Sequence, residues 1–104
     1  MKIEKIFDEK ELTVNIEGRI DTITSKEFED RLNEELDNIT SLTLDFTKLE
    51  YVSSAGLRVL IATQKKLKQK DVPMTITNVN KTIKEIFRMS GFDKILEITW
   101  IILN

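Results

Sequence analysis

Hydrophobic and polar residues alternate along three separate stretches of this chain. The stretches read ELTVNIEG (11–18), SLTLDFT (41–47) and VPMTITN (72–78). A period of two predicts β-strands that bury one face and leave the other more polar. The opening KIEKIFD (2–8) is predicted to pair with the first of these stretches through a turn at residues 8–10. EITWIIL (97–103) is predicted to be the last strand.

Between the strands the hydrophobic period becomes that of a helix. Residues 24–39 place Phe28, Leu32, Leu36 and Ile39 on one helical stripe. Thr24 or Ser25 is expected to cap this helix, and Thr24 followed three residues later by Glu27 fits a capping box.

Two further helices are predicted downstream. Residues 54–70 carry Leu57, Leu60, Ile61 and Leu67 at helical spacing, and residues 78–91 carry Val79, Ile83, Ile86 and Phe87. Gly91 suits the end of the last helix, because glycine readily adopts the left-handed conformation found there.

This order, β-β-α-β-α-β-α-β, predicts one small α/β domain over residues 1–104. Strands joined through helices require parallel pairs, so the sheet should be mixed, with about five strands. Parallel strands covered on both faces are hydrophobic throughout, whereas these alternate. We therefore expect the helices to cover mainly one face.

Composition narrows the range of functions. The chain is 40% hydrophobic and 33% charged, with a net charge of −2, which indicates neither direct nucleic-acid binding nor a membrane surface. No run reaches the roughly 20 apolar residues of a membrane span, and the start has no signal-peptide pattern. The expected location is the cytoplasm.

Several kinds of chemistry lack the residues that they need. Cysteine and histidine are absent, and the only glycines are Gly18, Gly56 and Gly91. The absence of cysteine and histidine excludes thiolate chemistry and histidine catalysis. The positions of the three glycines exclude a P-loop and a G-x-G-x-x-G turn. We expect a protein that is not an enzyme and has no cofactor or metal site.

The stretch YVSSAGLRVL (51–60) holds the candidate chemistry, since two serines precede an aliphatic helix. Either Ser53 or Ser54 could cap that helix, and because a cap needs only one of them, a second hydroxyl is left at the helix N-terminus for phosphorylation. Backbone N–H groups and the positive end of the helix dipole stabilise a phosphate there. Arg58, one turn later on the same helix face, could pair with that phosphate.

Three stretches together resemble the STAS domain family of bacterial anti-sigma factor antagonists: GRIDTITS (18–25), LDFTKLEYVSSAGLRVLI (44–61) and IKEIFRMSGFDKILEI (83–98). The resemblance implies a switch protein that binds an ATP-binding anti-sigma kinase while unmodified. Phosphorylation of a serine two positions before the glycine, here Ser54, releases it, and a serine phosphatase restores it. It also places Asp21 near that serine, and it leaves Ser53 as the better candidate for the helix cap.

The partner surface is expected to comprise Asp21, Thr24, Ser53, Ala55, Gly56 and Arg58. Binding sites of α/β folds gather at the carboxyl ends of strands. We therefore expect the Asp21 turn and the Ser53–Gly56 turn to lie side by side.

Two alternatives remain open. The family commonly has Asp where this chain has Ser53, and Ser or Thr where it has Ala55. The missing Asp is the ground for the first alternative, a STAS-type binding module of another assembly that is never phosphorylated. A receiver-like domain would instead use Asp45 as a phosphoacceptor. That chemistry also needs an acidic pair after the first strand and a lysine after the last. The sequence offers only Asp8 and Glu9 in a presumed hairpin turn, and WIILN (100–104) contains no lysine.

Overall fold

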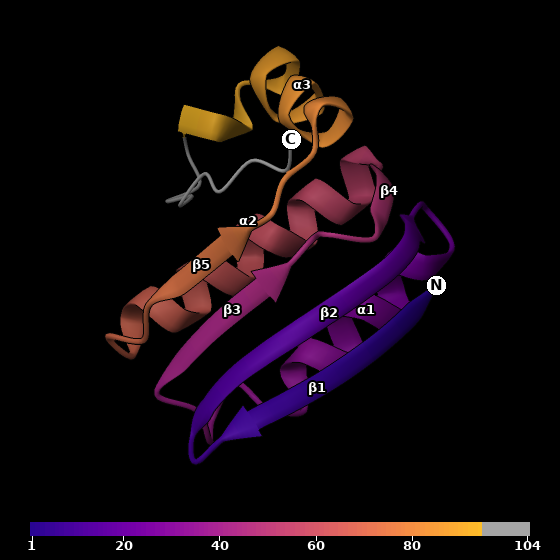
Figure 1. Ribbon diagram of the computed structural model, residues 1–104. Helices are drawn as coiled ribbons and strands as arrows, with labels where there is room; N and C mark the ends of the chain where they lie inside the picture. The colour runs from indigo at the N-terminus through magenta and orange to yellow at the C-terminus, as the bar shows by residue number, and fades with distance from the viewer. Residues whose placement is uncertain (95–104) are drawn as a thin grey trace.

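The computed structural model describes residues 1–94 and contains five strands, three α-helices and a short 3-10 helix (Figure 1). In chain order they are β1 (Lys2–Asp8), β2 (Glu11–Ile20), α1 (Thr24–Asn33), β3 (Ser41–Asp45), β4 (Leu49–Val52), α2 (Ser54–Gln69), β5 (Met74–Thr77), α3 (Lys81–Ser90) and η1 (Phe92–Lys94).

The sheet is mixed, as predicted, with the strand order β1-β2-β3-β5. The pair β1–β2 is antiparallel, whereas β2–β3 and β3–β5 are parallel. The far end of β2 leaves β3 and pairs in parallel with β4, after a register shift between Gly18 and Arg19. Gly18 has a φ of +100°, which an L side chain rarely adopts. The shift lets one strand serve two neighbours.

Helices α1 and α2 lie side by side on one face of the sheet (Figure 1). The alternating strands turn their apolar residues toward these helices, and the opposite residues are only half-buried. The core includes Leu12, Val14, Phe28, Leu32, Leu42, Leu44, Phe46, Leu57, Leu60 and Phe87. The predicted one-sided α/β domain is therefore confirmed.

Three details differ from the prediction. Strand β4 was not among the strands predicted from the sequence. Helix α1 ends at Asn33 rather than continuing to residue 39, although Leu36 and Ile39 are still buried in the segment that follows. The predicted strand 97–103 lies outside the described residues.

Candidate functional site

The candidate site lies at the carboxyl ends of β2 and β4, where each strand leads into a helix. Ile20 pairs with Val52 in the last register position of the two strands. The backbone N–H of Ser53 then donates to the carbonyl oxygen of Ile20 over 2.7 Å. The turn after β2 and the start of α2 are therefore joined side by side, as predicted.

The turn after β2 is closed by the side chains of Asp21 and Thr24. Asp21 Oδ1 accepts hydrogen bonds from the backbone N–H of Ile23 at 2.9 Å and of Thr24 at 2.8 Å. In return, the Asp21 backbone N–H donates to Thr24 Oγ1 at 2.8 Å. Thr24 Oγ1 also lies 2.9 Å from the Arg19 carbonyl oxygen, to which it donates.

These contacts correct the predicted capping of α1. Thr24 is the first helical residue rather than the cap, and the preceding Ile23 makes no side-chain cap hydrogen bond. The reciprocal pair is Asp21 and Thr24, three residues apart, instead of Thr24 and Glu27. The pair with capping-box spacing therefore lies three residues earlier than predicted.

The same hydrogen bonds keep the Asp21 carboxylate charged. The backbone N–H of Thr24, its hydroxyl and then the Ile23 N–H favour the ionised form and lower the pKa of Asp21 below its ordinary value of 3.8. The positive charge of Arg19 acts in the same direction. The turn therefore presents a stable negative charge at this end of the sheet.

The two serines before α2 have different surroundings. Ser53 is buried and caps the helix, since its hydroxyl oxygen accepts from the Gly56 backbone N–H at 3.2 Å. Ser54 is the first helical residue and is exposed. Its hydroxyl makes no hydrogen bond to any residue of the described range 1–94. The prediction that Ser53 is the cap is confirmed.

Gly56 allows α2 to start close to the ends of both strands. A Cβ atom at this position would lie 2.7 Å from Ile20 Cγ2 and 2.9 Å from Val52 Cγ1. Both neighbours are fully buried, so neither methyl group has room to move. Glycine therefore has a packing role here.

Arg58 is exposed one turn after Ser54, and Ala55 is half-buried beside it. A second arginine flanks the site from the sheet: the Arg19 guanidinium lies 4.5 Å from the centre of the Tyr51 ring, a cation–π contact between paired residues of β2 and β4. The sequence analysis did not single out this pair, because the pairing depends on the register shift at Gly18.

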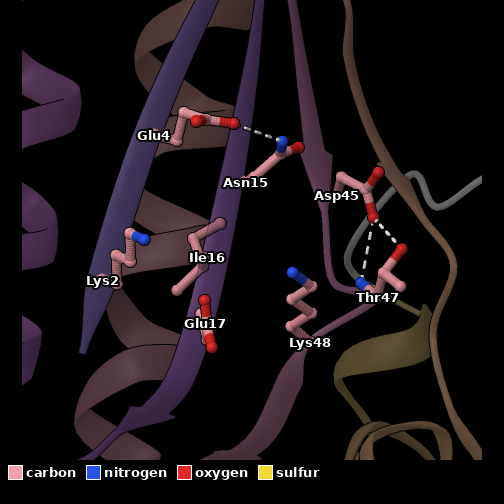
Figure 2. Close-up of a pocket in the computed structure, with 8 residues that line it drawn as sticks. All are labelled: Lys2, Glu4, Asn15, Ile16, Glu17, Asp45, Thr47 and Lys48. Atoms are coloured by element: carbon pink, nitrogen blue, oxygen red, sulfur yellow. Dashed lines mark hydrogen bonds between the residues drawn. The ribbon is translucent and has the colours of Figure 1, made fainter.

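Asp45, the acceptor of the receiver-like alternative, closes a separate turn. Its Oδ1 accepts from the backbone N–H and the hydroxyl of Thr47, as Figure 2 shows, and from Asn78 Nδ2 at 3.2 Å. Partial burial opposes ionisation, but these hydrogen bonds outweigh it and lower the pKa of Asp45. Within residues 1–94 no group of three acidic residues could hold a metal ion.

A hollow of about 280 Å³ lies beside Asp45, between β1, β2 and the loop that leads to β4 (Figure 2). Its lining carries charges of both signs: Lys2, Glu4, Asn15, Ile16, Glu17, Asp45, Thr47 and Lys48. None of the residues predicted for the partner surface lines it. The structure thus separates the predicted site from this hollow.

The site also contains an apolar residue that the sequence analysis missed. Ile23 is 87% exposed and sits between two residues of the Asp21 turn. The signal was an isoleucine flanked by Thr22 and Thr24, off the hydrophobic stripe of α1. Such an isoleucine contributes little to a core.

The arrangement of sheet, helices and paired turns defines a small α/β domain with a mixed sheet, and comparison with known proteins identifies its family. The STAS domain family model matches residues 2–103, so the chain belongs to the STAS domain family.

Two sequence relatives are named as anti-sigma factor antagonists. The anti-sigma-F factor antagonist RsfB of Mycobacterium tuberculosis is 32% identical over 82 residues, which cover 78% of this chain and 66% of RsfB. The matched part thus spans just under two thirds of that relative. The anti-sigma-B factor antagonist of Staphylococcus aureus is 25% identical over 94% of this chain and 92% of its own length.

The fold has solved counterparts. The anti-sigma factor antagonist SpoIIAA in its unphosphorylated form superposes with a TM-score of 0.81 at 13% identity, over 95% of this chain and 87% of SpoIIAA. At this identity the likeness shows the fold alone. No helix among residues 1–94 has the length and apolar character needed to cross a membrane.

Proposed function

We propose that this protein is an anti-sigma factor antagonist that works by partner switching. In the unmodified state it binds an ATP-binding anti-sigma kinase, which then releases its sigma factor. The kinase phosphorylates Ser54 and thereby ends the complex, and a serine phosphatase reverses the modification. The descriptions of RsfB and of the S. aureus relative support the antagonist role.

The observation that carries the proposal is the different use of the two serines. Ser53 caps α2, so the hydroxyl of Ser54 is not needed for that cap. Ser54 is also exposed. A kinase could therefore modify Ser54 without removing the cap. A serine also caps a helix about as well as the aspartate common in the family at position 53, so that departure leaves the helix start intact.

The chemistry of the position explains how a phosphate would be tolerated by the fold but not by the complex. The added charge of about −2 sits at the positive end of α2, with Arg58 one turn away, so the free protein can accommodate it. In an interface, the same charge would lose its hydration, and this desolvation cost opposes the complex.

The test is the affinity for the anti-sigma kinase of the source cell, purified and measured by calorimetry. Ser54→Asp should bind at least about 10-fold more weakly, roughly 1.4 kcal/mol, and Ser54→Ala should still bind. Thr82→Asp is the matched control, because it adds the same charge to the exposed first turn of α3. It should bind like the wild type.

Equal binding by Ser54→Asp and the wild type would reject the switch. It would favour the second reading, a STAS-type binding module that is not phosphorylated. Failure of the wild-type protein to bind any anti-sigma kinase would reject the antagonist role itself.

A further inference from the structure

Ile23 is the most exposed large apolar side chain in the part of the chain that the structure describes. It is 87% exposed, compared with 78% for Met89, 51% for Phe7 and 48% for Ile6. A single exposed apolar residue needs no explanation in itself. Ile23 differs from the others in where it lies and in how firmly its backbone is held.

The backbone around Ile23 is fixed on both sides. Its own N–H and that of Thr24 both donate to Asp21 Oδ1. The next residue, Ser25, donates its backbone N–H to the Asp21 carbonyl oxygen at 2.9 Å and its hydroxyl to the Thr22 carbonyl oxygen at 3.1 Å. Presenting Ile23 to a partner therefore costs little backbone entropy, which is the condition for a preorganised contact.

Ile23 also lies in the turn that adjoins the phosphorylation candidate. Ile20, three residues earlier, is hydrogen-bonded through its carbonyl oxygen to Ser53, the residue before Ser54. A surface that covers Ser54 and reaches the Asp21 turn would meet Ile23.

A charged group stands beside this apolar one. All three side-chain hydrogen bonds to the Asp21 carboxylate end on Oδ1. Oδ2 accepts none from residues 1–94, so the carboxylate has a free oxygen for a partner. An apolar side chain next to an available carboxylate oxygen is complementary to an apolar pocket bordered by a lysine or arginine.

We propose that Ile23 is the apolar anchor of the partner surface and selects an anti-sigma kinase with an apolar pocket beside a basic residue. This inference rests on the proposed function, whose switch it extends. Ser54 would determine when the complex forms, and Ile23 would supply much of its affinity as a central, desolvated contact.

The experiment compares three variants in the same calorimetric assay with the purified anti-sigma kinase. Ile23→Ser should weaken binding at least about 10-fold, and Ile23→Val should restore most of it because the apolar surface returns. Met89→Ser is the matched control, since it removes a similarly exposed apolar side chain from α3. It should bind like the wild type.

Denaturant unfolding of all three variants should match the wild type, because neither side chain is part of the core. If the wild type binds the kinase and Ile23→Ser binds it with the same affinity, the anchor is overturned and the proposed function still stands. An equal loss in Met89→Ser would also overturn it. If Ile23→Ser binds weakly while Ser54→Asp binds normally, the anchor stands and the switch fails.

Discussion

Two turns at the same end of the sheet begin a helix in similar ways but use their side chains differently. After β2, both Asp21 and Thr24 are committed to hydrogen bonds that close the turn. After β4, Ser53 alone caps the helix, and Ser54 is exposed to solvent. In the first turn the hydroxyl of Thr24 takes part in folding, whereas the second turn leaves the hydroxyl of Ser54 without a folding role. That difference identifies Ser54 as the candidate for regulation.

The largest effect on stability should come from filling the close approach beneath the second turn. Gly56→Ala places a methyl group within 3 Å of Ile20 and Val52, which are both fully buried. We expect a loss of about 1–3 kcal/mol in the free energy of unfolding. Alanine is more favourable than glycine within a helix by up to about 1 kcal/mol. The sign of the change in the free energy of unfolding therefore shows whether the steric cost of the methyl group exceeds this gain. Increased stability in a denaturant titration would show that α2 does not pack so tightly here.

The comparison between the two serines can be tested by matched truncation. Ser53→Ala removes the acceptor of the Gly56 N–H and should destabilise by about 1 kcal/mol. Ser54→Ala should change the free energy of unfolding by less than about 0.5 kcal/mol. Chemical denaturation of both variants measures the difference directly. The reverse order would assign the cap to Ser54 and remove the basis for its regulatory role.

The smallest expected effect concerns the charge of the first turn and depends on pH. The folded-state pKa of Asp21 is lowered, so its contribution is present above the ordinary pKa of 3.8 and is lost as the pH falls through the folded value. Asp21→Asn keeps an acceptor at the same place but has no charge. The wild type should therefore exceed this variant in stability near pH 7, and the gap should shrink below about pH 4.

Denaturant titrations at several pH values test this difference. A gap between the wild type and Asp21→Asn that stays constant or widens in acid would show that the carboxylate charge does not stabilise the turn.

The regular parts of the fold could be predicted because their signals are local. Alternation in β2, β3 and β5 identified the strands and their one-sided burial. Gly91 has the left-handed φ of 78° that its position after α3 suggested. Strand β4 was not predicted because its sequence LEYV does not alternate strictly, and its pairing with β2 depends on a register shift far away in sequence.

For the site, the sequence analysis could use only residue types and the spacing between residues. The role of Ser53 as a cap was predicted, whereas Gly56 was predicted for the partner surface and is buried in a close contact between α2 and the strands. The spacing of Asp21 and Thr24 was visible, but Thr24 with Glu27 offered the same spacing. In the structure Thr24 is already helical, and its hydroxyl and backbone N–H pair with Asp21. Exposure, which distinguishes Ile23, cannot be read from one sequence.

The most direct test of the account is the position of the phosphate. The wild-type protein is incubated with its anti-sigma kinase and ATP, and peptides covering residues 51–66 are analysed by mass spectrometry. We expect one phosphate, on Ser54, and none in Ser54→Ala. Phosphate on Ser53, or on neither serine while the kinase is demonstrably active, would contradict the account.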